Sequence, residues 1–338
     1  MVRRTMKTKK PIILSGIQPT GNLHIGNYLG AIKHWVDLQN SNKYNCYFVI
    51  VDYHALTGNQ TAAERHANSM NVATELLAAG IDPKKSTLFV QSAVPECTEL
   101  AWIFNTITPV SELNRMTQFK DKSEHQEKNI NAGLLTYPIL QAADILLYHG
   151  NFVPVGQDQV QHVELTRDIA RWFNNRYSST HPGYFPETKV LLTEIPKVMS
   201  LLEPTKKMSK SHGLNTVIEL RDEPEEIAQK LKKAITASAG GGEAPGVSNL
   251  LTLLKHFGSK QDFSAFLKAE KDGSIRYGDL KNAVGMAITH HFADFRKRRV
   301  ELMKKQSQVK KIIAEGANHA RSTAQKTMKE VRALVGIA

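Results

Sequence analysis

The sequence is poor in cysteine and has no long apolar segment. Cys46 and Cys97 are the only cysteines among 338 residues, and two thiols so far apart form neither a disulfide framework nor a zinc cluster. No run of about 18 apolar residues is present, which excludes a transmembrane helix. The first ten residues are basic, but the apolar stretch after them is too short for a signal peptide, and we expect an unstructured arm there. Together these features predict a cytoplasmic protein.

The charge is unbalanced and concentrated in one part of the chain. There are 44 Lys and Arg against 32 Asp and Glu, a net charge of +12. Residues 276–338 carry fourteen basic and five acidic residues, a net charge of +9. A basic helical surface is often simply solvated, but charge this concentrated also attracts a polyanion over long range. Composition alone leaves both interpretations open, a solvated surface and a nucleic-acid partner.

Apolar runs alternate with helical periods through the first two thirds of the chain. The β-branched and aromatic runs at 11–15, 47–51 and 87–90 are typical of strands covered on both faces. Apolar residues at helical spacing follow Gly26, and a second such stretch ends at Gly80, before an Asp-Pro pair. A strand–helix–strand order requires parallel pairing through right-handed crossovers. The sequence therefore predicts an α/β fold built on a Rossmann-like, doubly wound parallel sheet.

The last third of the sequence has helical periods and few strand signals. Residues 223–226 combine a proline with acids, as is typical of the first turn of a helix. The apolar stripe expected on this helix consists of Ile227, Leu231, Ala234 and Ile235. Residues 240–246 are rich in glycine, and we expect a loop there. We therefore predict a catalytic domain over residues 1–203 and an all-helical domain over residues 204–338.

A segment rich in Gly, Pro and Asn, residues 15–27, follows the first predicted strand and opens a helix. Ligands of open α/β sheets bind beyond the carboxyl ends of the strands, and a helix N-terminus offers free N–H groups to an anion. His24 and Asn27 are placed to donate to phosphate oxygens. The alternative is a tight turn with an exposed histidine.

A second segment, residues 204–213, packs three lysines and two serines between a proline and a glycine. Such a loop can close over a polyphosphate, because its ammonium groups offset the charge that builds up on leaving pyrophosphate. Phosphoryl-type transfer depends mostly on positioning and charge neutralisation. The alternative is a solvated basic loop.

Taken together, the two segments resemble the signatures of one enzyme family. Residues 24–27 (HIGN) resemble the HIGH signature of class I aminoacyl-tRNA synthetases, and residues 207–211 reproduce the KMSKS signature letter for letter. The chain is also similar to the tryptophanyl-tRNA synthetase family in its small size, in the absence of an editing insertion and in several further stretches. These stretches are residues 26–31, 115–120, 133–148, 153–159 and 162–168.

The resemblance implies a reaction and its partners. The enzyme would activate L-tryptophan with ATP and Mg²⁺ to tryptophanyl-adenylate, and would transfer the amino acid to tRNA(Trp). The helical domain would bind the anticodon, where single-stranded bases can be recognised by stacking and hydrogen bonds. The family also implies a homodimer. No metal site built from protein side chains is expected.

The resemblance also implies which residues form the site. The catalytic residues would be Lys207, Lys210, His24 and Asn27. ATP would contact Gln18, Pro19, Thr20, Gly26, Asn27, Gly156, Gln157, Asp158, Val198, Lys207, Met208, Ser209, Lys210 and Ser211. Tryptophan would contact Asp144, Tyr137, His54 and Gln159. The chain departs from the family pattern at Leu14, Gln141 and Gln157, which affects the shape of the pocket rather than the reaction.

Asp144 is the residue on which amino-acid specificity would depend. It lies in an otherwise apolar helical segment, where a carboxylate is costly unless something donates to it. By resemblance it would accept a hydrogen bond from the indole N–H, and such a site rejects analogues that lack the donor. The alternative is an acid at a helix surface or cap.

Other functions stay open on the sequence alone. A tyrosyl-tRNA synthetase is the nearest alternative, since physics does not separate an indole N–H from a phenol O–H at Asp144. A small-molecule adenylyltransferase would share the turn after the first strand but would not need the lysine loop or a basic helical region. A non-catalytic nucleic-acid-binding relative would not need intact copies of both signatures.

Overall fold

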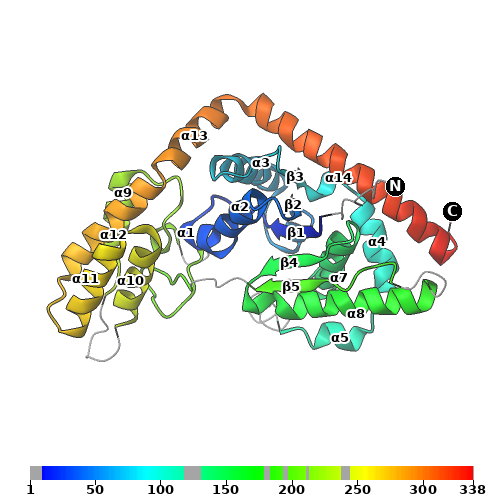
Figure 1. Cartoon of the computed structure of the whole chain (residues 1–338), viewed down its shortest axis with the longest axis horizontal. Helices are drawn as coiled ribbons and strands as arrows, with labels where there is room; N and C mark the ends of the chain where they lie inside the picture. Colours follow the sequence, from blue (N-terminus) through cyan, green and yellow to red (C-terminus); the bar gives the residue numbers. More distant parts are fainter. Residues whose placement is uncertain are drawn as a thin grey trace, which may run out of the picture.

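The computed structural model describes residues 10–117, 131–178, 183–192, 197–210, 213–236 and 244–337, except for the side chain of Asp158. Among these residues, no helix is both long enough and apolar enough to cross a membrane. The chain forms a sheet enclosed by helices, a cluster of helices at one end, and a long helical arm that joins the two (Figure 1).

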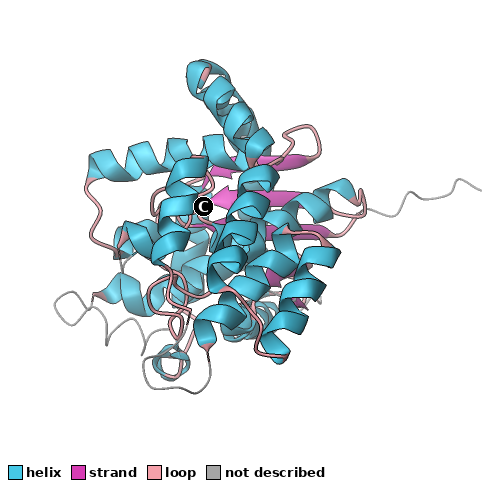
Figure 2. Ribbon diagram, turned by 90° about the vertical axis from the view of Figure 1, so that its left-hand side faces the viewer, coloured by secondary structure: helices cyan, strands magenta, loops and turns pink. Residues whose placement is uncertain are grey.

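The sheet has five parallel strands in the order β3-β2-β1-β4-β5. The strands are β1 (Ile12–Ile17), β2 (Asn45–Ile50), β3 (Ser86–Val90), β4 (Phe152–Val155) and β5 (Lys189–Leu192). Figure 2 shows the strands running through the middle of the molecule with helices around them. The first three strands lie where the apolar runs predict them, so the prediction of a doubly wound parallel sheet is confirmed.

Helices pack on both faces of the sheet and give it two apolar cores. On one face, Trp35 stacks on Phe48 with their ring centroids 4.7 Å apart. On the other face, Leu14, Tyr47 and Phe104 lie in a second buried cluster. The helical elements of this part are α1 (Ile25–Asn27), η1 (Tyr28–Ile32), α2 (Lys33–Asn40), η2 (His54–Thr57), α3 (Ala62–Ala78), η3 (Gln91–Ala93), α4 (Glu96–Asn105), α5 (Val110–Asn114), α7 (Ala132–Leu146), η4 (Gln157–Gln159) and α8 (Val160–Tyr177).

The rest of the chain is helical, as predicted. It contains η6 (Leu214–Thr216), α9 (Pro224–Lys233), α10 (Pro245–Phe257), α11 (Lys260–Lys271), α12 (Tyr277–His291), α13 (Ala293–Lys304) and α14 (Gln306–Val335). Helices α9 to α12 lie together at one end of the molecule (Figure 1). The predicted start of α9 is confirmed, because Glu223 and Glu226 form a reciprocal cap there.

Two details of the sequence prediction are wrong in this part. Ile235 does not continue the apolar stripe, because α9 ends at Lys233 and the Ile235 side chain is exposed. Pro245 and Gly246 do not belong to a loop, since they form the first turn of α10. A proline is tolerated there because a backbone N–H at the start of a helix has no hydrogen-bond partner within the helix. Residues 240–243 of the expected loop lie outside the described residues.

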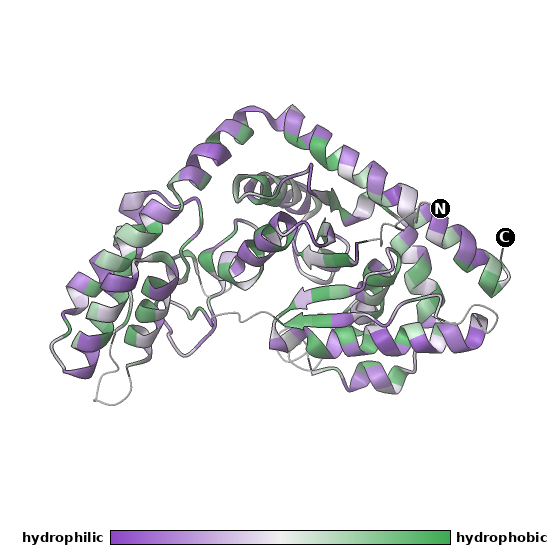
Figure 3. Ribbon diagram, in the orientation of Figure 1, coloured by the Kyte–Doolittle hydropathy of each residue, from purple (hydrophilic) through white to green (hydrophobic). Residues whose placement is uncertain are grey.

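The arm formed by α13 and α14 returns to the sheet. Helix α14 lies directly on β3: a Cβ atom on Gly316 would be only 2.0 Å from the carbonyl oxygen of Leu88. Figure 3 shows apolar residues alternating with polar ones along this helix, and Ala320, Ala324 and Met328 are among those that are buried. The arm therefore covers the edge strand, and the predicted division of the chain at residue 203 stays a prediction.

Three arginines of the arm form ion pairs with acids of the sheet part. These pairs are Arg299 with Glu75 of α3, Arg321 with Glu96 of α4 and Arg332 with Glu99 of α4. Part of the basic charge of residues 276–338 is therefore used within the chain, where it fixes the arm to α3 and α4. The exposed lysines of the arm add to the positive surface.

Candidate active site

Two loops open from one edge of the sheet, at the point where the strand order reverses. Strand β1 has β2 on one side and β4 on the other, and in such sheets the crevice at the carboxyl ends of these strands binds ligands. The β1 loop, residues 18–24, follows β1, and Gly156 and Gln157 follow β4. The structure therefore brings the two groups of predicted nucleotide-binding residues to the same edge.

Within the β1 loop, a buried proline lies between two exposed side chains. Pro19 is buried and its carbonyl accepts a hydrogen bond from Gln60 Nε2 at 2.9 Å, whereas Gln18 and Thr20 are exposed. Gly21 has φ = 105°, in the region that favours glycine. The loop thus keeps a fixed backbone while two of its predicted ATP contacts face solvent.

His24 caps the helix that follows the β1 loop. Its Nδ1 accepts a hydrogen bond from the Gly26 N–H at 3.1 Å, and Asn27 Oδ1 accepts one from the His24 N–H at 3.1 Å. Because Nδ1 is an acceptor, the ring proton of the neutral histidine lies on Nε2. The side chain is only 7% exposed, so the alternative of a turn with an exposed histidine is wrong.

The environment of His24 keeps its ring uncharged at neutral pH. The pKa of His24 is lowered from 6.5 to about 4, mainly by burial and also by the nearby Lys210 and Lys207, against the opposite effect of Glu219. A neutral imidazole with its proton on Nε2 is a hydrogen-bond donor that carries no charge of its own. The lysines supply the positive charge at this edge.

The lysine loop, described for residues 204–210, contacts the β1 loop. Lys210 Nζ donates to the carbonyl oxygens of Thr20 and Asn22, each at 2.8 Å. The two signature segments, which lie more than 180 residues apart in sequence, therefore meet at one place. Both segments must lie this close together if they are to bind the same triphosphate.

The other members of the lysine loop differ in exposure. Met208 is buried, and its N–H donates to the carbonyl of Val198 at 2.9 Å. Ser209 is half-buried, and its carbonyl accepts from Thr216 Oγ1. Lys207 is exposed. Ser211 lies outside the described residues, as does the side chain of Asp158.

Asp144 lies in a buried polar cluster with Gln91 and His54. Asp144 is 5% exposed. Gln91 Nε2 donates to both of its oxygens at 2.8 Å, and His54 Nε2 donates to Oδ2 at 2.9 Å. Asp144 is therefore neither a surface acid nor a helix cap, and the donors that a buried carboxylate needs are present. A carboxylate offers about four lone-pair sites, which leaves room for one more donor.

One further residue predicted for the amino-acid pocket, Tyr137, lies beside this cluster. The Tyr137 ring packs edge-on against the His54 ring with centroids 6.2 Å apart, and the Tyr137 hydroxyl is hydrogen-bonded to His162 Nε2 at 2.8 Å. Gln159 ends η4, in the loop after β4. Asp144, His54 and Tyr137 are thus brought together from α7 and η2, and Gln159 lies on the segment that follows β4.

Gln91 is a residue of this site that sequence analysis missed. It is buried, and its Oε1 accepts from the Tyr53 N–H at 3.1 Å, so its amide nitrogen must face Asp144. Gln91 comes directly after β3. A polar residue immediately after a buried strand is a signal that could have identified it, because the carboxyl edge of the sheet is where ligands bind.

No metal centre is apparent in the described part of the chain, where no three His, Cys, Asp or Glu side chains are grouped to hold an ion. A polyphosphate at this edge would meet lysine ammonium groups, the Nε2–H of His24 and backbone N–H groups. A nucleotide that brings its own divalent cation fits such a set of donors.

Comparison with known proteins agrees with this geometry. The family described as tRNA synthetases class I (W and Y) matches residues 6–293, most of the chain. A parallel sheet whose β1 loop meets a lysine loop at its carboxyl edge defines the class, and the chain belongs to this family of class I tRNA synthetases. The resemblance seen in the sequence is confirmed.

The proteins that are similar over nearly the whole length of both chains include tryptophan–tRNA ligases. The tryptophan–tRNA ligase of Wolinella succinogenes is 46% identical, over 97% of this chain and 99% of that protein. The tryptophan–tRNA ligase of Clostridium tetani is 44% identical, over 98% and 97%. The crystal structure of tryptophanyl-tRNA synthetase from Campylobacter jejuni, complexed with ADP and tryptophan, matches with a TM-score of 0.82 at 33% identity and covers 96% of this chain and 99% of that chain.

Proposed function

We propose that this protein is a tryptophan–tRNA ligase, which activates L-tryptophan with MgATP and transfers it to tRNA(Trp). The observation that carries the proposal is the contact of Lys210 with the carbonyls of Thr20 and Asn22, because it places both class I signatures at one edge of the sheet. The identity of 46% to a tryptophan–tRNA ligase over nearly the whole chain favours tryptophan over tyrosine.

In the first step, a carboxylate oxygen of tryptophan attacks the α-phosphorus of MgATP. The bond between this phosphorus and the bridging oxygen breaks, and pyrophosphate leaves with its charge balanced by Mg²⁺ and by Lys207 and Lys210. His24, through Nε2–H, and Asn27 position the phosphates. No side chain acts as a nucleophile, so positioning and electrostatic stabilisation provide the acceleration.

In the second step, a hydroxyl of the terminal ribose of tRNA attacks the carbonyl carbon of the adenylate, and AMP leaves. The ribose and adenine of ATP would lie against Gly156, Gln157, Asp158 and Val198, on the β4 side of the edge. Ser209 and Ser211 would cover the phosphates together with Met208. These assignments follow from the family resemblance.

Selection of tryptophan depends on Asp144. We assign it as the acceptor of the indole N–H, with His54, Tyr137 and Gln159 around the amino acid. The three hydrogen bonds from Gln91 and His54 hold its carboxylate in one orientation. An amino acid without a donor at this point would leave a buried acceptor with one bond fewer, which reduces binding.

The enzyme would act as a homodimer in the cytoplasm. Trp102 on α4 is 71% exposed and lines an open hollow with Leu56 and Leu140. Large exposed apolar side chains around a hollow are typical of a protein interface, and a second copy is the partner that the family implies. The free thiols of Cys46 and Cys97 suit a reducing compartment.

The test is amino-acid-dependent exchange of labelled pyrophosphate into ATP. The proposal expects exchange with tryptophan and little with tyrosine, and charging of tRNA(Trp) by the same preparation. Exchange with tyrosine instead would make the chain a tyrosine enzyme. Exchange with neither amino acid would overturn the catalytic proposal.

A further inference from the structure

We propose that Glu75 and Arg299 are positioning residues, which hold the β1 loop in its ATP-binding conformation from the arm of the molecule. This role rests on the proposed function, in which the β1 loop contacts ATP. Neither residue belongs to a class I signature: Glu75 lies on α3 and Arg299 on α13.

Glu75 is the contact between α3 and the backbone of the β1 loop. Its side chain is completely buried, and its Oε2 accepts a hydrogen bond from the Leu23 N–H at 2.6 Å. Arg299 Nε donates to the other oxygen, Oε1, at 3.0 Å. Burial of an ion is unfavourable unless it is paired and hydrogen-bonded, so each of these two donors is needed to keep the carboxylate charged and in place.

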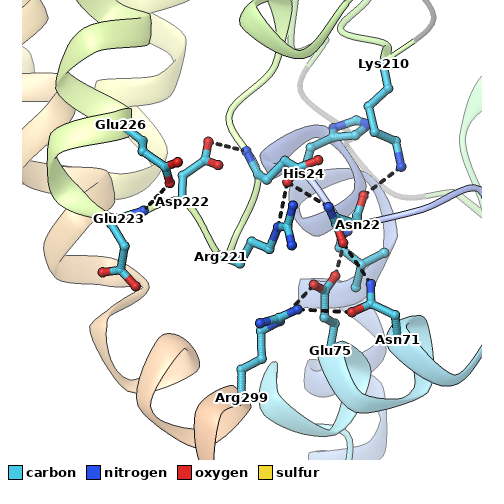
Figure 4. A network of polar contacts seen from close by, with 12 residues as sticks. Asn22, His24, Asn71, Glu75, Lys210, Arg221, Asp222, Glu223, Glu226 and Arg299 are labelled. Atoms are coloured by element: carbon cyan, nitrogen blue, oxygen red, sulfur yellow. Dashed lines mark hydrogen bonds and ion pairs between the residues drawn. The ribbon is translucent and has the colours of Figure 1, made fainter. Parts of the chain in front are cut away.

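A second path leads from the same arginine to the same loop. The other end of the Arg299 guanidinium donates to Asn71 Oδ1 at 3.1 Å, and Asn71 Nδ2 donates to Asn22 Oδ1 at 3.0 Å. Figure 4 shows Arg299 reaching Glu75 and Asn71, which lie side by side on α3 and face the loop. A planar guanidinium can hold two acceptors in a fixed geometry, so Arg299 sets the positions of Leu23 and Asn22 together.

The lysine loop depends on the residue that this network fixes. The carbonyl of Asn22 is one of the two acceptors of Lys210 Nζ. The Asn22 amide also donates to Glu219 Oε2 at 2.9 Å, and residues 218 and 220 form backbone hydrogen bonds with Ile25 and Leu23. Asn22 is thus held from α3 on one side and from the segment that precedes α9 on the other.

A purely structural ion pair would look similar, and the chain contains one that can serve as a control. Arg321 Nε donates to Glu96 Oε1 at 2.9 Å, and Glu96 is also buried. This pair likewise joins the arm, through α14, to a helix beside the sheet. Among the described residues, no hydrogen bond connects Glu96 or Arg321 with the β1 loop.

The experiment compares Glu75→Gln with Glu96→Gln. Each change removes one buried charge that pairs with an arginine of the arm. For each variant we would measure the melting temperature, tryptophan-dependent pyrophosphate exchange at varied ATP and tryptophan concentrations, and MgATP binding by titration calorimetry. In Glu75→Gln, a single amide oxygen must serve two donors. We expect KM and Kd for ATP to rise roughly 10- to 100-fold, as for loss of a charge-assisted hydrogen bond, with KM for tryptophan within about twofold of the original protein.

Further variants keep the test decisive if Glu75→Gln does not fold. Arg299→Lys keeps the charge but loses the planar guanidinium that binds Glu75 and Asn71 together. We expect KM for ATP to rise, but less than in Glu75→Gln. Asn71→Ala leaves the ion pair intact and breaks only the path to Asn22, which should raise KM for ATP roughly 3- to 10-fold. Glu96→Gln should lower the melting temperature and leave both KM values within about twofold of the original protein.

The outcomes separate this inference from the proposed function. If Glu75→Gln and Asn71→Ala bind ATP like the original protein, or if Glu96→Gln weakens ATP binding equally, the positioning role is wrong. If the original protein binds MgATP but shows no amino-acid-dependent exchange, the proposed function fails. Calorimetry on the same variants would then still support or overturn the role of Glu75 and Arg299.

Discussion

Replacement of Asp144 by asparagine tests the assignment of amino-acid specificity most directly. The substitution keeps the size of the side chain but turns one of its two acceptor oxygens into an NH₂ donor. In the structure, both oxygens face donors, namely Gln91 Nε2 and His54 Nε2. Whichever way the new amide is oriented, two donors oppose each other, and the negative charge that attracts an indole N–H is lost.

The size of the effect follows from the kind of bond that is removed. Hydrogen bonds to a charged group contribute about 1.5–3 kcal/mol, and tenfold in an equilibrium corresponds to about 1.4 kcal/mol. We therefore expect kcat/KM for tryptophan to fall roughly 10- to 150-fold in Asp144→Asn. The change also disturbs the packing of the buried cluster, so the loss for tryptophan alone would not prove the contact.

A substrate analogue separates the two causes. In the benzothiophene analogue of tryptophan, sulfur replaces the indole N–H without a large change in shape. The original protein should prefer tryptophan to this analogue by a factor of the size given above, and in Asp144→Asn the preference should disappear. Pyrophosphate exchange measures both substrates, and Asp168→Asn, at a half-exposed position on α8, is the control. An unchanged preference in Asp144→Asn would refute the assignment.

Four further results are expected. Lys210→Ala should slow pyrophosphate exchange about 10²- to 10³-fold, whereas the exposed neighbour Lys206→Ala should not; near-normal exchange without Lys210 would refute its role. The pKa of His24 is about 4 in the folded protein and 6.5 in the unfolded chain, so the unfolded state binds more protons between these two pH values. The free energy of unfolding should therefore fall as the pH drops from 6.5 to 4, by about 3 kcal/mol at most. Urea unfolding should show this fall, and a weaker fall in His24→Gln. Trp102→Glu should shift the protein from dimer to monomer in light scattering. KM for tRNA should rise steeply with salt, while pyrophosphate exchange should not.

Local pattern in the sequence identified the elements of the fold, but not all of their contacts. The strands at Ile12–Ile17, Asn45–Ile50 and Ser86–Val90 follow from apolar runs, because a strand covered on both faces needs apolar side chains on both. The end of α9 was misjudged at Ile235, since an apolar residue at helical spacing does not show whether the backbone continues as a helix. Gly246 was misjudged because proline and glycine also occur in the first turn of a helix.

The site shows the same limit more clearly. His24 and Lys210 could be singled out because two short signatures resemble a family, and the structure brings them together. Arg299 could not be found in this way. Its partner Glu75 is 224 residues away, and nothing in the sequence around either residue indicates the other. Glu75 itself lies among apolar residues of a helix, which signals a buried acid but not what binds it.

The packing of α14 on β3 has a consequence for how this protein is made. Strand β3 is an edge strand of the sheet, and an uncovered edge strand can pair with strands of other chains. The helix that shields it is synthesised after all five strands, and Gly316 allows it to lie flush against the strand. A nascent chain that stalls before this helix would therefore leave the edge strand uncovered. Removal of the residues from Gln306 onward should yield aggregates rather than a smaller enzyme.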